Sequence, residues 1–191
     1  MIDVAPRTAE DFANWDDDCG EGRRWSELVS GKIIRHSPPD PEHGRIVLNL
    51  SKAIALHVQN TVDAADGYAC FELGLIIARN PDTVRCPAIS YFTSGPRFAE
   101  LEKVVTETRP ALVVEVASSA DRRKGATERV ESYLNWGVQL VWMADPVEKQ
   151  VHVLPRGKQP RLLGMTHTLE GAPAIPGFRM PVAEVFAQPS P

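Results

Sequence analysis

The stretch "ALVVEVASS", residues 111–119, decides the fold. Four aliphatic residues form a nearly continuous apolar run, which is typical of a strand that is covered on both faces near the centre of a sheet. An acid, Glu115, interrupts the run on the same face as Val113 and Ala117, because side chains alternate along a strand. Burying an ionised carboxylate is costly without a partner or a metal ion. The partner of Glu115 must therefore come from a neighbouring strand or helix.

Composition predicts one folded domain over residues 1–191, with residues 1–22 as an acidic extension that contains a short helix around Ala9–Trp15. The chain is 43% hydrophobic and 24% charged, which is typical of a globular protein with a sizeable core. A net charge of −4 argues against coating of nucleic acid by overall charge, although a local basic patch remains possible.

The three cysteines are far apart and form no CxxC pair, so neither a disulfide framework nor a zinc knuckle is expected. The start of the chain lacks a basic region followed by an apolar stretch, and no apolar run is long enough for a membrane span. These features predict a cytoplasmic protein with no membrane partner.

The segments around the central strand predict a mixed sheet flanked by helices. Residues 24–37 alternate around Ser30-Gly31, which indicates a β-hairpin, and Asp40-Pro41 begins an amphipathic helix that extends to residue 60. Further elements are expected in this order: antiparallel strands at 68–78 and 84–92, a helix at 121–136 that Gly137 ends, strands at 138–145 and 149–154, and a short final helix.

Five segments carry a resemblance to a known family. They are "SELVSGKIIRHSPPDPEHGRIV" (26–47), "DTVRCPAISYF" (82–92), "LVVEVASSADRR" (112–123), "YLNWGVQLVWMADP" (133–146) and "IPGFRMPVAEVF" (175–186). In this order they resemble the Uma two family of "putative restriction endonucleases", within the PD-(D/E)XK nuclease superfamily. The resemblance covers almost the whole chain, and it implies an α+β (α/β), restriction-endonuclease-like fold.

The resemblance also implies metal-dependent hydrolysis of DNA. Members look like nucleases in which acids hold Mg²⁺ beside a basic residue, and such a cation polarises a phosphoryl oxygen and activates water. Carried over by position, the strand glutamate is Glu115, Ala88 stands where the aspartate of the proline-aspartate pair belongs, and Arg129 stands in the place of the lysine. The resemblance therefore predicts an eroded active site.

Other residues could complete or replace this site. Glu42 and His43, before the first long helix, could supply a metal-binding acid and a water-positioning group, or Glu42 could only complement the helix dipole. Lys124 is a conceivable substitute for the lysine, but five residues separate it from Arg129, which is about 140° on one helix. The dipeptide Pro81-Asp82 is better explained by turn chemistry than by a displaced ligand.

The sequence leaves two readings of Glu115 and several functions open. Glu115 is either a remnant of a metal or phosphate site or a buried acid paired with Arg129 or Lys124, and both predict a shifted pKa. The first function is an Mg²⁺-dependent endonuclease that uses Glu42, Glu115 and Arg129. The alternative is an inactive nuclease-fold protein that binds nucleic acid, through a basic cluster at 122–124, or that acts in protein interaction as a homodimer.

Overall fold

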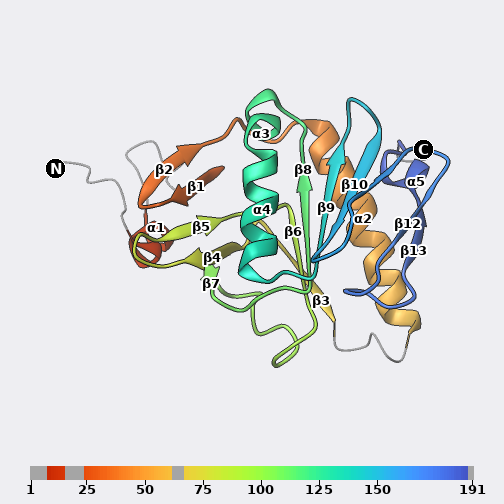
Figure 1. Cartoon of the computed structure of the whole chain (residues 1–191). Coiled ribbons are helices and arrows are strands. Elements are labelled where there is room, and N and C mark those ends of the chain that lie inside the picture. Colours follow the sequence, from red (N-terminus) through yellow and green to blue (C-terminus); the bar gives the residue numbers. More distant parts are fainter. Residues whose placement is uncertain (1–7, 16–23, 62–66, 189–191) are drawn as a thin grey trace.

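The computed structural model describes residues 8–15, 24–61 and 67–188, and Figure 1 shows how their elements are arranged. Its helices are α1 (Ala9–Ala13), α2 (Pro41–Asn60), α3 (Ala120–Lys124), α4 (Ala126–Trp136) and α5 (Val182–Val185). Its strands are β1 (Ser26–Val29), β2 (Lys32–Arg35), β3 (Tyr68–Phe71), β4 (Gly74–Ala78), β5 (Thr83–Arg85), β6 (Ile89–Phe92), β7 (Val105–Thr106), β8 (Leu112–Val116), β9 (Leu140–Asp145), β10 (Gln150–Pro155), β11 (Arg161–Leu163), β12 (Thr168–Glu170) and β13 (Arg179–Pro181).

The strand β8 lies inside a six-stranded mixed sheet with the order β11-β10-β9-β8-β6-β3, as the sequence predicts. It runs parallel to β9 and antiparallel to β6, and all five of its residues are buried. Val114 and Val116 pack in the core that contains Ile46, Leu50 and other residues of α2. Val113 packs on the opposite face with residues of α4. Helices therefore cover β8 on both faces, and Glu115 points toward α4.

A second, five-stranded mixed sheet has the order β2-β1-β5-β4-β7 and lies beside α4 (Figure 1). The predicted hairpin forms its β1 and β2, and the turn between them places Ser30 and Gly31 in the left-handed region, with φ of 49° and 72°. The predicted helix is confirmed as α2, in which the Asp40 side chain accepts a hydrogen bond from the His43 backbone amide at 2.7 Å.

Two predicted strands are each divided between the two sheets. The run 68–78 becomes β3 and β4, which are separated at Glu72, a residue with φ of 51°. The run 84–92 becomes β5 and β6, with residues 86–88 between them. Because β3 pairs with β6 and β4 pairs with β5, one long hairpin begins in the five-stranded sheet and ends in the six-stranded sheet.

The prediction of a single helix at 121–136 is wrong. This segment forms two helices, α3 and α4, with Gly125 between them. A Cβ atom at Gly125 would lie 3.0 Å from Nη1 of Arg129, so the glycine leaves room for that guanidinium. The calculated angle between Lys124 and Arg129 assumed one continuous helix and therefore does not apply.

The ends of the chain agree with the predictions where the structure describes them. Helix α1 confirms the short helix near Ala9, and residues 1–7 and 16–22 of the predicted extension lie outside the described residues. At the other end, α5 packs on α2, where the Asn49 side-chain amide donates to the Val185 carbonyl at 3.1 Å. No helix in the described part of the chain is long and apolar enough to cross a membrane.

Candidate functional site

Both oxygens of the Glu115 carboxylate have partners on α4. Oε1 accepts a hydrogen bond of 2.7 Å from the Tyr133 hydroxyl, and Oε2 lies 3.3 Å from Nε of Arg129. Arg129 and Tyr133 are four residues apart on α4 and thus share one face of the helix. All three residues are at most 3% exposed. The structure therefore pairs Glu115 with Arg129, one of the two basic residues that the sequence offered as partners.

The guanidinium of Arg129 is held at its other end by the backbone. Its Nη2 donates a hydrogen bond of 2.6 Å to the carbonyl of Arg122, at the C-terminal part of α3. The space that Gly125 leaves open lies beside the same guanidinium. The break between α3 and α4 thus positions Arg129 so that its Nε faces Glu115.

A second buried acid, Glu27 of β1, lies in the five-stranded sheet. Its Oε2 is 2.7 Å from Nη1 of Arg85 and 3.3 Å from Nε2 of His36, and its Oε1 accepts a hydrogen bond of 3.2 Å from the Cys86 backbone amide. Arg85 also pairs with Glu128 of α4 at 2.7 Å. Glu27 therefore links the hairpin to the end of β5, where the chain leaves this sheet.

The two acids belong to one network of charged and polar side chains in the interior, which we call the charged centre: Glu27, His36, Arg85, Glu115, Arg129 and Tyr133. Burial raises the pKa of Glu27, but the hydrogen bond with His36 and the positive charges of Arg85 and Arg129 outweigh it and lower this pKa to about 2. Burial raises the pKa of Glu115, and the neighbouring Glu27 adds to this effect, whereas Arg129 opposes it. Two buried carboxylates thus face two buried guanidinium groups, and their formal charges cancel.

The other residues predicted for the site lie outside this network. Glu42 is in the first turn of α2, where its half-exposed carboxylate pairs with Arg45. Lys124 is exposed at the end of α3. His43, which follows Glu42 in the sequence, is buried, and its Nε2 lies 3.5 Å from Oε1 of Glu72.

Two positions relate to the proline-aspartate pair of the family: Ala88 stands where the aspartate is expected, and Asp82 belongs to the Pro81-Asp82 dipeptide upstream. Ala88 is 2% exposed and belongs to the apolar cluster that includes Ile89 and Val114. Asp82 accepts hydrogen bonds from the Ala9 and Asn80 backbone amides, at 2.8 and 3.2 Å, and pairs with Arg79. Asp82 therefore serves the turn, as expected, and it also anchors the start of α1.

Sequence reasoning missed most of the charged centre. Glu27, like Glu115, is an acid within a short strand, but neither the hairpin pattern at 24–37 nor the family resemblance gives it a role. Arg85 is 58 residues from Glu27 in sequence, and the interaction depends on the pairing of β1 with β5. His36 and Tyr133 show no local pattern that distinguishes them from ordinary residues.

The charged centre does not fit a Mg²⁺ ion. Such an ion requires several oxygen ligands, and the chain's own donors already engage the carboxylate oxygens of Glu115 and Glu27. Two guanidinium groups beside these acids would repel a cation, and Ala88 offers no ligand. Across residues 8–15, 24–61 and 67–188, no three His, Cys, Asp or Glu side chains are grouped so that they could hold a metal ion.

Comparison with protein families gives a match over most of the chain. The model of the Uma2 family, described as "Putative restriction endonuclease", matches residues 9–183. The chain is a Uma2 protein. All six residues of the charged centre lie within the matched part of this Uma2 chain.

The fold of this Uma2 protein also occurs in a solved structure. A "putative nuclease belonging to DUF820" from Anabaena variabilis superposes with a TM-score of 0.75 at 21% sequence identity. The match covers 95% of this chain and 98% of that one, so the two share one nuclease-like fold over nearly their whole length. No curated protein matches this Uma2 chain.

Proposed function

We propose that this Uma2 protein binds DNA but does not catalyse the Mg²⁺-dependent hydrolysis that a nuclease carries out. The observation that carries the proposal is the pairing of both Glu115 oxygens, one with Tyr133 and one with Arg129. A nuclease site must keep carboxylate oxygens available for its metal ion. Here Arg129 takes the place of the cation and stays protonated at any accessible pH, so it cannot act as a general base.

Binding of DNA is supported by the position of two exposed cations beside the charged centre. Arg123 and Lys124 are both exposed on α3, which follows β8 after a short loop, and Nη1 of Arg123 donates to the Ala117 carbonyl at 3.4 Å. Contacts from these two side chains to phosphates would release counterions. Since the chain has a net charge of −4, binding must depend on such a local patch rather than on overall charge.

The first experiment measures cleavage. Supercoiled plasmid, linear duplex and single-stranded DNA are incubated with the wild-type protein in Mg²⁺ and in Mn²⁺, and we expect no cleavage. Cleavage that disappears in Glu115→Gln would overturn the proposal and support a metal-dependent nuclease. If circular dichroism shows that Glu115→Gln does not fold, Glu115→Asp replaces it, because its side chain is one methylene shorter and draws the carboxylate back from the position of a metal ion; loss of cleavage in this variant would have the same meaning.

The second experiment measures binding of duplex and single-stranded DNA by fluorescence anisotropy at several salt concentrations. Two phosphate contacts predict that the logarithm of the binding constant falls with the logarithm of salt concentration at a slope of roughly −2. Arg123→Ala with Lys124→Ala should remove most of the binding. Binding that this double variant leaves unchanged would refute the assignment of these two residues.

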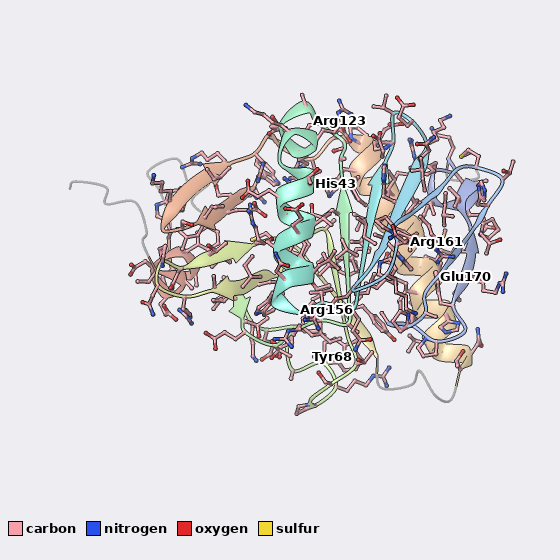
Figure 2. The ribbon with its side chains drawn as sticks, in the orientation of Figure 1. His43, Tyr68, Arg123, Arg156, Arg161 and Glu170 are labelled. Carbon is pink, nitrogen blue, oxygen red and sulfur yellow. The ribbon has the colours of Figure 1, made fainter. Side chains whose placement is uncertain are left out.

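The matched control is Arg156→Ala with Lys158→Ala, which removes the same charge from the turn after β10. Figure 2 shows Arg123 and Arg156 at opposite ends of the central strands, and the Arg156 backbone amide donates to Gln139 just before β9. This control should bind DNA like the wild type. Equal losses in both double variants would indicate non-specific attraction instead of a site on α3.

A further inference from the structure

An apolar groove of about 520 Å³ lies away from the charged centre, along the edge strand β3. One of its walls is α2, with Leu48 and Ala55, and the other is the segment 97–101. β3 forms part of the floor and has a single neighbour, β6, in the described sheet. The volume falls in the range of small-molecule sites, roughly 300–1,000 Å³.

The groove carries several large apolar side chains that are unusually exposed. They are Leu48, Phe71, Phe98 and Leu101, with exposed fractions of 58%, 51%, 48% and 54%. Single exposed apolar residues are ordinary, but a contiguous group around one groove marks a binding surface. The aromatic rings of Tyr68 and Phe98 both line the groove and contact each other, with their centroids 5.4 Å apart.

Two cations stand at the rim of this mostly apolar groove. Lys52 comes from α2 and Arg97 from the opposite wall, and both are exposed. Within the described residues neither has a carboxylate partner; the Arg97 guanidinium lies 4.6 Å from the centre of the Phe98 ring. The positive charge of Arg97 also opposes the rise that burial causes in the pKa of Tyr91, another residue that lines the groove. In the part of the chain that the structure describes, the groove therefore combines a mostly apolar lining with two positive charges that no carboxylate pairs.

We propose that the groove binds a single-chain amphipathic carboxylate. The apolar chain of the ligand packs between α2 and the segment 97–101, and its carboxylate pairs with Lys52 and Arg97 at the rim. Charge decides the class of ligand, because an amphiphile with a cationic head would meet two like charges. The groove shares no residue with the charged centre, so this proposal does not depend on the one made for DNA.

The test uses dodecanoate, below its micelle concentration, titrated into the full chain by isothermal calorimetry. We expect one dodecanoate per chain, and dodecyltrimethylammonium should bind at least tenfold more weakly. Lys52→Glu with Arg97→Glu should weaken dodecanoate at least tenfold. Ala55→Trp, a change at an exposed position of α2, should block the groove. The control Arg156→Glu with Lys158→Glu makes the same charge change elsewhere and should leave binding unchanged.

Four results would overturn the proposal. Absence of dodecanoate binding, or equal binding of the two amphiphiles, would contradict the charge argument. Full binding to a folded Ala55→Trp variant would place the ligand elsewhere. Light scattering that shows a dimer, and a monomer for Phe71→Glu, would mean that a second copy of the chain covers the groove.

Discussion

Replacing Glu27 by glutamine tests the charged centre most directly. The pKa of Glu27 is lowered from 4.5 to about 2, and each tenfold change in an ionisation constant is worth about 1.4 kcal/mol. The ionised carboxylate thus contributes about 3 kcal/mol to the free energy of unfolding. Glu27→Gln should lose this amount at pH 7, because Arg85 would keep only the exposed Glu128 as an acidic partner.

The sign of the pH dependence follows from the direction of the shift. A carboxyl group whose pKa is lowered by folding stabilises the folded state above pH 4.5, and this contribution disappears as the pH falls toward 2. The stability of the wild type should therefore fall over this interval more steeply than that of Glu27→Gln. The two curves should approach each other near pH 2.

Urea unfolding, followed by circular dichroism at pH 7, 5, 4 and 3, measures both curves. The control is Glu131→Gln, which changes the same functional group at an exposed position of α4 and should alter stability by no more than about 0.5 kcal/mol. A loss in Glu27→Gln that is as large at pH 3 as at pH 7 would refute the reasoning, because it would show that packing rather than charge stabilises this position.

Three further predictions concern other buried groups. Tyr133→Phe leaves Oε1 of Glu115 without its donor and should cost about 1–3 kcal/mol in urea unfolding; an unchanged stability would mean that water replaces the hydroxyl. Ala88→Asp places a carboxylate in an apolar cluster, so it should lower the melting temperature, and 5 mM Mn²⁺ should not restore it; rescue by Mn²⁺ would show that a metal site can be rebuilt. Burial raises the pKa of Cys70 to about 11, so its thiol should react with an aromatic disulfide reagent at pH 8 much more slowly in the folded than in the urea-unfolded chain, and equal rates would contradict its burial.

Local patterns predicted the elements of the fold better than their division into sheets. The apolar run around Glu115, the turn at Ser30-Gly31 and the cap at Asp40 act over a few residues, and each was found as expected. The passage of the chain from the six-stranded to the five-stranded sheet at Glu72 was not predicted, because a strand that changes sheets keeps its alternating pattern. The break at Gly125 was missed because one glycine within a helical pattern is usually tolerated.

The candidate site shows the same limit. Sequence alone could say that Glu115 needs a partner, and it named Arg129 as one of two possibilities. It could not select between them, since the choice depends on where α4 starts. It could not find Glu27 and Arg85 at all, because only the pairing of distant strands brings these two residues to 2.7 Å.

The hairpin that passes from one sheet to the other has a consequence for how the chain unfolds. Strands β4 and β5 cannot separate from the five-stranded sheet without pulling on β3 and β6, which continue the same two segments of chain. Glu27 pairs with Arg85 and accepts a hydrogen bond from the Cys86 amide, and these contacts stabilise the place where the chain leaves the five-stranded sheet after β5. The two sheets should therefore open as one cooperative unit, in which the slowest amide protons of β1 and β8 exchange with the same free energy of opening.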